Sequence, residues 1–298
     1  MKRKKSDLSI QKIPVPKEEQ HIPPPGGNGM MPVHEFTMGL IAPKGSGKTT
    51  TLVNLLEIYA GYFHEIYVFS PTVKSDCKWD YVKTLKLLVD NMPLKKWIHD
   101  MESEKQLNGP VQPTPLPAVF SEIVDPEKKF QEELSDECFF EDEDISADFF
   151  KIVDRQFKMV RLLKKYGKLK SFANRVLIIL DDQVGSELFD GSAKKKFKAF
   201  NTKHRHYSVS LLMVAQGYKE IPKTVRTNWT CLLLYKIGNM KELEVIYEEY
   251  ALGLTWDEWI EMYRHATNEK YNFFFADMYT DDDGKKIRKN FDTALCLN

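Results

Sequence analysis

The residues best suited to chemistry lie in one segment, residues 36–50, which reads FTMGLIAPKGSGKTT. A hydrophobic stretch leads into a loop of small residues and then into a segment that opens with Lys48 and Thr49. This spacing follows the P-loop pattern G-x-x-x-x-G-K-[ST], with Ala42 in place of the first glycine. The predicted phosphate-binding residues are Ala42, Pro43, Lys44, Gly45, Ser46, Gly47, Lys48, Thr49 and Thr50. The segment therefore predicts that the chain binds a nucleoside triphosphate, ATP or GTP.

Phosphate geometry explains this spacing. Gly45 and Gly47 let the backbone curl until successive N–H groups point at an anion, and the helix that follows adds the positive end of its dipole. Lys48 is placed to contact the β- and γ-phosphates, and the Thr49 hydroxyl is placed to ligate Mg²⁺. The alternative is a Gly-Ser linker beside a chance Lys-Thr pair, which the flanking strand and helix patterns disfavour.

A carboxylate pair, Asp181 and Asp182, follows the apolar run LIIL. The pair therefore lies at the C-terminal end of a strand, where ligands bind in open α/β sheets. We expect Asp181 to hold Mg²⁺ and Asp182 to orient or deprotonate the attacking water. A solvated turn would also carry two carboxylates, but the upstream P-loop favours the catalytic interpretation.

Gln216 directly follows a second apolar run, SVSLLMVA. An amide at this position can hydrogen-bond the γ-phosphate or the attacking water. The alternative is a glutamine that caps a turn before Gly217. We include Gln216 among the predicted catalytic residues, with Lys48 and Asp182.

Arg205 precedes the same run and is expected at the opposite, N-terminal edge of the strand, away from the nucleotide of its own subunit. That position suits an arginine finger that reaches the ATP of a neighbour in a ring. Arg226 is the second candidate. The alternative is a surface arginine at the end of a basic helix, because residues 191–206 hold six Lys and Arg and no acid. The same basic cluster suits sequence-independent contacts with the DNA backbone.

Elements that position these residues alternate between strands and helices. We expect strands at 36–42, 65–70, 175–180, 208–215, 231–237 and 272–278, and helices at 47–60, 78–89, 149–166, 240–250 and 255–267. Near-continuous apolar strands are typical of a parallel sheet covered on both faces. The predicted fold is α/β, a P-loop NTPase with a central, mainly parallel sheet flanked by helices on both faces.

The predicted domain organisation is a tail at 1–33, rich in Pro and basic residues, and an ATPase domain at 34–298 with a charged insertion at about 91–170. A tail of this composition cannot bury enough surface to fold alone. In the insertion, residues 121–150 hold 12 acidic and 2 basic side chains, whereas residues 151–170 hold 8 basic and 1 acidic. The acidic stretch is either a lid on the basic helix or a solvated insertion, and charge runs favour the latter.

Composition narrows the class of protein further. Lys plus Arg and Asp plus Glu balance at 43 each, so net charge does not favour nucleic acid as a partner. No apolar run reaches the ~20 residues of a membrane span, and no signal peptide is evident. The four cysteines are far apart, which indicates free thiols in a reducing compartment. We expect an intracellular protein of the host cytoplasm or a viral factory, with the nucleus and the virion as alternatives.

The chain resembles a known family, the poxvirus-type DNA-packaging ATPases of large DNA viruses, within the FtsK/HerA superfamily. The resemblance covers roughly residues 34–240 and rests on the P-loop strand and on the segments IYVFSPTV, VLIILDD and RHYSVSLLMVAQGYKEIPKTVRTNW. It implies an oligomeric motor that uses ATP to drive double-stranded DNA into a preformed capsid, docked at the capsid or its portal vertex. Ala42 and the long acidic insertion depart from the pattern.

Three other functions compete with this interpretation. A helicase or replication ATPase of the same class fits Gln216 equally well. A nucleotide kinase needs an arginine-bearing lid, and residues 91–148 contain no arginine. A non-catalytic scaffold is disfavoured by the intact Lys48, Thr49, Asp181 and Asp182.

Overall fold

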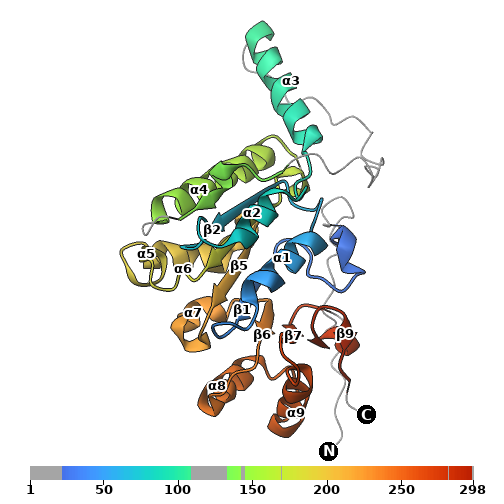
Figure 1. The fold of residues 1–298 in the computed structure, drawn as a ribbon. Coiled ribbons are helices and arrows are strands. Elements are labelled where there is room, and N and C mark those ends of the chain that lie inside the picture. Colours follow the sequence, from blue (N-terminus) through green and yellow to red (C-terminus); the bar gives the residue numbers. More distant parts are fainter. Residues whose placement is uncertain (1–21, 109–132, 142–144, 169, 281, 297–298) are drawn as a thin grey trace, which may run out of the picture.

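The computed structural model describes residues 22–108, 133–141, 145–168, 170–280 and 282–296. In these residues the strands form one nine-stranded sheet of order β3-β2-β4-β5-β1-β6-β7-β8-β9 (Figure 1). The strands are β1 (Thr37–Ile41), β2 (Glu65–Phe69), β3 (Phe139–Phe140), β4 (Val176–Asp181), β5 (Val209–Ala215), β6 (Cys231–Leu234), β7 (Phe274–Asp277), β8 (Ile287–Lys289) and β9 (Thr293–Ala294).

The neighbouring strands of the run β3-β2-β4-β5-β1-β6 pair in parallel. The neighbouring strands of the run β6-β7-β8-β9 pair antiparallel. The parallel strands β1, β4, β5 and β6 are buried along their whole length, as expected where helices cover both faces. The predicted fold class, a mainly parallel α/β sheet flanked by helices, is confirmed.

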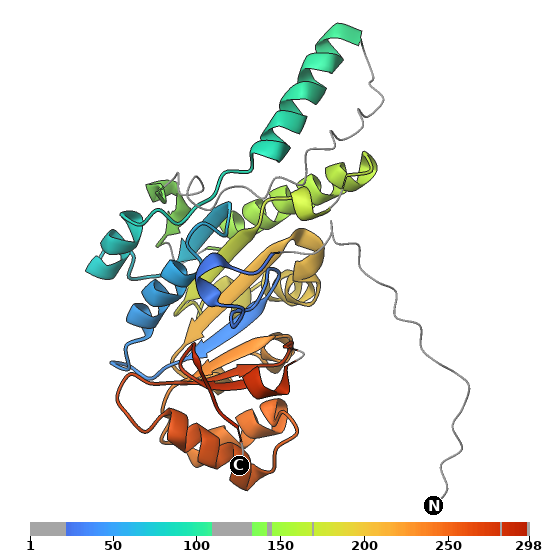
Figure 2. The same cartoon turned by 90° about the vertical axis from the view of Figure 1, so that its right-hand side faces the viewer.

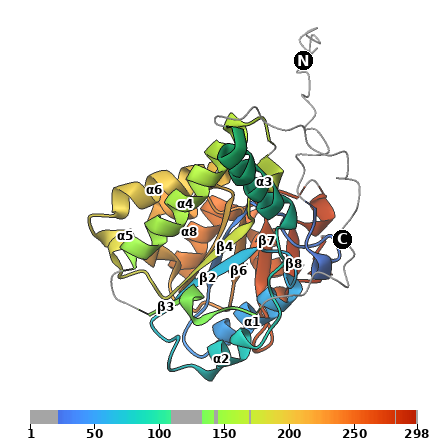
Figure 3. The same cartoon turned by 90° about the horizontal axis from the view of Figure 1, so that it is seen from above.

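Helices lie on both faces of the sheet, which Figure 3 shows from above. Their bounds are α1 (Lys48–Ile58), α2 (Cys77–Lys83), α3 (Met92–Asn108), α4 (Ser146–Lys165), α5 (Glu187–Asp190), α6 (Lys194–Lys203), α7 (Lys223–Arg226), α8 (Met240–Tyr250) and α9 (Trp256–Ala266). The first two pack on one face, and α4 to α9 pack on the other. Successive side chains of a strand point to opposite faces of the sheet. Leu40 therefore belongs to the core on the α1 side, and Ile41 to the core on the α4 side.

The predicted insertion contributes to the main core. Helix α4 buries Phe149, Ile152 and Val153 against the sheet, and β3 adds an edge strand beside β2. Helix α3 packs Leu94 near Leu163 of α4 and then extends away from the sheet (Figures 1 and 2). Half of the acidic stretch, residues 121–132 and 142–144, lies outside the described residues, so the choice between lid and solvated insertion stays open.

Part of the predicted tail is packed. Of its residues 22–33, Met31 is 5% exposed and joins the core on the α1 side. The Met30 carbonyl accepts a hydrogen bond from the buried Arg288. The position of the domain boundary at residue 33 remains a prediction.

The elements differ from the predictions mainly at their ends. The helix expected at 78–89 is the shorter α2, which ends at Lys83, and Leu88 lies instead in an extended segment that bridges with Phe63. Strands β3, β8 and β9 and helices α3, α5 and α7 are not among the predicted elements, and α6 enters the predictions only as the basic helix before Arg205. Among the described residues, no helix is both long and apolar enough to cross a membrane.

Candidate functional site

Sheet topology places the P-loop and the carboxylate pair at the same edge. Strand β1 leads into the loop, β5 lies next to β1, and β4 lies next to β5. The parallel register aligns Ile41 with Ala215 and Asp181 with Val214, so all three strands end together. Residues that follow β1, β4 and β5 therefore meet at one C-terminal edge, as predicted.

The P-loop backbone uses its glycines where the chain needs left-handed conformations. Gly45 has a φ of 78° and Gly47 a φ of 96°, values that residues with a Cβ rarely adopt. Ala42 has a negative φ and is fully buried, and its N–H donates to the Ala215 carbonyl at 3.0 Å. An alanine therefore fits the first position without strain.

The other predicted loop residues surround the start of α1. The Ser46 hydroxyl donates to the Pro43 carbonyl at 2.6 Å and closes the loop. Lys44 and Thr50 are exposed, and Thr49 is partly exposed in the first turn of α1. These positions leave the loop open to an incoming phosphate chain.

Lys48 lies between the two carboxylates. Its Nζ forms an ion pair with Asp182 Oδ2 and lies 3.7 Å from Asp181 Oδ1. The Lys48 side chain is 18% exposed. The carboxylates thus place next to the lysine the kind of negative charge that a phosphate chain would also offer.

Asp181 is buried and only partly satisfied. Its Oδ2 accepts a hydrogen bond from Ser70 Oγ at 2.9 Å. Its Oδ1 has no hydrogen-bond partner among the described residues. Burial raises the pKa of Asp181, while the Lys48 charge opposes that rise. A buried carboxylate oxygen that has a distant ion-pair partner but no hydrogen bond is costly and fits a site that a cation completes.

The described residues contain no cluster of three or more His, Cys, Asp or Glu side chains that could hold a metal alone. Mg²⁺ is usually held by one or two protein oxygens together with phosphate oxygens and water. Thr49 and Asp181 are oxygen donors at the loop and at the neighbouring carboxylate, so this donor set fits Mg²⁺.

Asp182 sits just past the end of β4 with a φ of 51°. Aspartate tolerates this left-handed conformation better than most residues. Its N–H donates to the Val214 carbonyl at 3.0 Å, and its Oδ2 accepts a weak hydrogen bond from Gln216 Nε2 at 3.4 Å. The backbone turn thus presents the Asp182 side chain, which is 26% exposed, to Lys48 and Gln216.

Arg205 lies at the opposite edge of the sheet, in a short 3₁₀ turn before β5. The seven residues of β5, at about 3.3 Å each, separate the two edges by roughly 23 Å. The guanidinium is exposed and lies 4.8 Å from the centre of the Tyr279 ring. Arg205 therefore cannot reach the P-loop of its own subunit.

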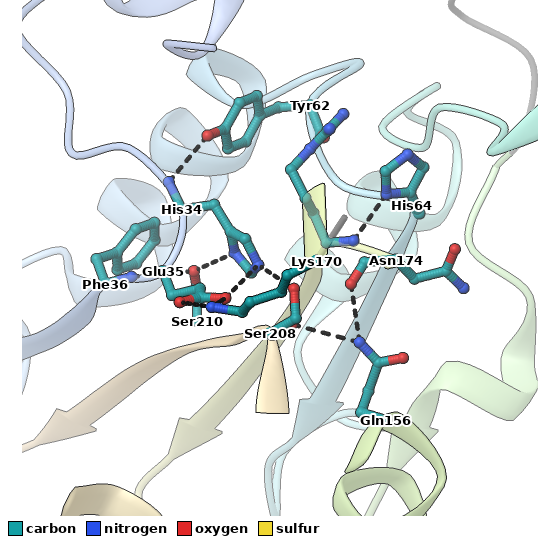
Figure 4. Close-up of polar contacts among 11 residues, drawn as sticks. His34, Glu35, Phe36, Tyr62, His64, Gln156, Lys170, Asn174, Ser208 and Ser210 are labelled. Atoms are coloured by element: carbon teal, nitrogen blue, oxygen red, sulfur yellow. Dashed lines mark hydrogen bonds and ion pairs between the residues drawn. The ribbon is translucent and has the colours of Figure 1, made fainter. Parts of the chain in front are cut away.

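A buried polar cluster underlies this edge (Figure 4). His34 contacts Ser210 Oγ at 2.7 Å and Ser208 Oγ at 3.1 Å. Lys170 Nζ donates to Glu35 Oε2 at 2.7 Å. Burial raises the pKa of Glu35, and the Lys170 and Arg205 charges oppose that rise. These contacts hold the backbone near Arg205 in place. Arg205 also lines a cavity of about 610 Å³.

Arg226, the second finger candidate, is committed to its own fold. Its guanidinium binds the Glu249 carboxylate in a bidentate arrangement at 3.0 and 2.9 Å, and it donates to the Ile221 carbonyl at 2.8 Å. The residue is 8% exposed. This geometry favours a structural role and leaves Arg205 as the candidate finger.

Arg226→Ala is expected to destabilise the chain by about 3 kcal/mol, because it leaves the Glu249 carboxylate, whose side chain is 10% exposed, without its bidentate ion pair and, among the described residues, with only the Tyr218 hydroxyl still donating to it. Urea unfolding measures this loss. Thr224→Ala, an exposed change in the same helix α7, is the matched control and should shift stability by less than about 0.5 kcal/mol. An Arg226→Ala chain of normal stability would contradict the structural assignment.

Ser70 was not among the predicted site residues. It directly follows β2, the strand beside β4, and its hydroxyl orients Asp181. The signal was present in the sequence, since a polar residue follows the run IYVF. Only the strand order reveals that this residue faces Asp181.

Comparison with known proteins bears on this arrangement. A family described as "Poxvirus A32 protein" matches residues 149–289, just under half of the chain. The matched residues include the carboxylate pair, Arg205 and Gln216, and the P-loop lies before them. No curated protein matches the chain.

Solved structures include several similar chains. The genome packaging NTPase B204 from Sulfolobus turreted icosahedral virus 2, in complex with AMPPCP, is 14% identical; the alignment covers 86% of this chain and 96% of that one, with a TM-score of 0.45. The pCW3 conjugation coupling protein TcpA, with ATPgS, is 13% identical over 81% of this chain and 57% of that one, with a TM-score of 0.48. EssC from Geobacillus thermodenitrificans is 11% identical over 72% and 34%, with a TM-score of 0.35.

The sequence motifs predicted a resemblance to the poxvirus-type DNA-packaging ATPases, and the match to the poxvirus A32 family over residues 149–289 confirms it.

Proposed function

We propose that this chain is an ATP-driven double-stranded DNA translocase that packages a viral genome into a preformed capsid. The observation that carries the proposal is the convergence of Lys48, Asp181, Asp182 and Gln216 at one edge of a parallel sheet, around a P-loop. The family match adds the packaging context. Residues 34–298 would form the ATPase domain.

ATP binding would exchange one anion for another at Lys48. Its ion pair with Asp182 would give way to the β- and γ-phosphates, which frees the Asp182 carboxylate. Asp182 then accepts a proton from the attacking water, and Gln216 holds that water or the γ-phosphate by hydrogen bonds. Asp181, oriented by Ser70, and Thr49 would hold Mg²⁺. When bound, Mg²⁺ neutralises the charge that develops on the phosphate oxygens.

The finger requires a second subunit. Because Arg205 lies at the edge opposite to its own P-loop, it serves the ATP of a neighbour in a closed ring. The Arg205 side chain is exposed and lies over the ring of Tyr279, so its guanidinium is accessible to a neighbouring subunit.

The DNA partner would be bound by its phosphates. Helix α6 buries Phe197 and Phe200, while Lys195 and Lys203 of the same helix are exposed. Exposed lysines make contacts that do not depend on sequence, as a translocating motor requires. The capsid or its portal vertex would be the second partner, inside the infected cell.

Duplex DNA should stimulate ATP hydrolysis. We expect the purified chain to hydrolyse ATP several-fold faster with linear double-stranded DNA of any sequence, and the stimulation to weaken as salt rises. The measurement is steady-state phosphate release over a salt series. Lys48→Ala is the control and should show no turnover with or without DNA.

Other outcomes would redirect the assignment. Stimulation by single strands alone, with separation of a forked duplex, would favour the helicase or replication ATPase. Phosphate transfer to a nucleoside acceptor would favour the nucleotide kinase. Hydrolysis that is indifferent to duplex DNA would contradict the translocase.

A further inference from the structure

A cavity of about 600 Å³ adjoins the P-loop on the side away from the carboxylates. One wall comes from Gly45, Gly47, the first turns of α1 and Lys78 of α2, and the other from the end of β6 and the turns that flank β7 and β8. Strand β1 separates the two sides, with β5 and β4 on one and β6 and β7 on the other. The catalytic carboxylates occupy the first side, and this cavity occupies the second.

This arrangement constrains a bound nucleotide. A phosphate chain on the P-loop that presents its γ end to Asp182 must direct its α end, and hence its nucleoside, toward the other side. The cavity volume falls within the range of small-molecule sites. Its walls are the right ones for a nucleoside, with a polar phosphate loop on one side and aromatic rings on the other.

Tyr271 is the ring nearest to the loop. A Cβ added to Gly47 would lie 3.0 Å from Tyr271 Cδ1, so the ring lies directly against the P-loop backbone. Its side chain is nevertheless well exposed, because the residue is 57% exposed overall. The residue has a φ of 73°, unfavourable for an aromatic residue. Such strain is often found at ligand sites.

A buried aromatic layer supports this wall. The Tyr235 and Phe273 rings lie 5.5 Å apart, and the Phe273 and Phe291 rings lie 4.9 Å apart. The Tyr235 hydroxyl contacts the Thr51 hydroxyl, which ties the end of β6 to α1. Two rings of the layer are buried, whereas Tyr271 is largely exposed, with Lys270 Nζ 4.7 Å from the centre of its ring.

The amides at the cavity are mostly engaged with each other. Asn290 Nδ2 donates to Asn272 Oδ1 at 3.0 Å, and Asn290 Oδ1 accepts from the Phe273 N–H at 3.2 Å. Asn272 Nδ2 donates to Glu269 Oε2 at 2.7 Å. These groups hold the turns in place, so on this wall the cavity offers a base stacking rather than hydrogen bonds, while the polar side chains of Thr50, Asn54 and Lys78 line the wall on the helical side.

We propose that this cavity binds the base and ribose of the nucleotide, with Tyr271 as the residue on which a purine base stacks. The proposal rests on the proposed ATPase function, and it adds the nucleoside contacts to a site defined so far by phosphate contacts alone.

The test separates nucleoside binding from phosphate binding. Affinities for AMPPCP and for inorganic tripolyphosphate, each with Mg²⁺, are measured by calorimetry on the full chain. Tyr271→Ala should weaken AMPPCP binding roughly 10-fold or more and leave tripolyphosphate binding unchanged. Tyr271→Phe keeps the ring and should bind both like the wild type.

Two controls frame the result. Lys48→Ala should weaken both ligands, and Tyr279→Ala, an equally exposed tyrosine (63%) at the opposite edge, should weaken neither. Wild-type AMPPCP affinity in Tyr271→Ala would overturn the stacking assignment, and so would equal weakening of both ligands. A Lys48→Ala chain that binds tripolyphosphate normally would instead contradict the proposed ATPase site.

Discussion

Asp182→Asn is expected to lower kcat for ATP hydrolysis by roughly 10²–10⁴-fold, the range for removal of a general base. Nucleotide affinity should be at least as high as in the wild type. The asparagine cannot form the ion pair that Asp182 makes with Lys48, so the lysine no longer has to leave a carboxylate in order to bind phosphate. Single-turnover hydrolysis and AMPPCP binding measure the two effects separately.

Two comparisons sharpen this prediction. Lys48→Ala should abolish turnover together with phosphate affinity, because the lysine contacts the phosphates directly. Asp182→Glu retains a carboxylate on a longer arm and should recover part of the lost rate. Wild-type hydrolysis by Asp182→Asn would show that another group activates the water. A loss of affinity equal to the loss of rate would make the Lys48–Asp182 pair a support for the loop instead.

The parallel part of the fold could be predicted because its strands carry strong local signals. Runs such as LIIL before Asp181 and the buried run before Gln216 are apolar along their whole length, which is typical of strands covered on both faces. Parallel strands end at a common edge, so the meeting of Lys48, Asp181, Asp182 and Gln216 followed from motif positions alone. The structure brings these four side chains together as the sequence indicated.

Features that depend on long-range pairing could not be predicted in the same way. Ser70 contacts Asp181 only because β2 lies beside β4, and Tyr271 reaches the P-loop only because β7 lies beyond β6 in the sheet. Strands β8 and β9 have three and two residues, too few to show a periodicity. Arg226 illustrates the same limit, since only the folded chain reveals its pairing with Glu249.

Arg205→Ala is expected to leave nucleotide affinity unchanged and to slow hydrolysis by the assembled ring by roughly 10³-fold or more, as for loss of an arginine finger. The reason is geometric, because the seven residues of β5 separate Arg205 from the P-loop of the same subunit by roughly 23 Å. Arg205 can therefore act only on the nucleotide of another subunit. Without assembly, the variant and the wild type should hydrolyse ATP at the same slow rate.

Mixing two inactive variants tests whether the arginine acts between subunits. An Arg205→Ala subunit keeps an intact P-loop, and a Lys48→Ala subunit keeps an intact Arg205. When the two variants occupy one ring, some interfaces place the intact Arg205 of a Lys48→Ala subunit next to the intact P-loop of an Arg205→Ala subunit. Each of these interfaces has a complete active site. Mixed rings should therefore regain part of the wild-type rate, in proportion to the number of such interfaces. If the mixture stays inactive while co-assembly is demonstrated, Arg205 does not act in trans. Wild-type hydrolysis by the Arg205→Ala ring would remove the residue from the reaction altogether.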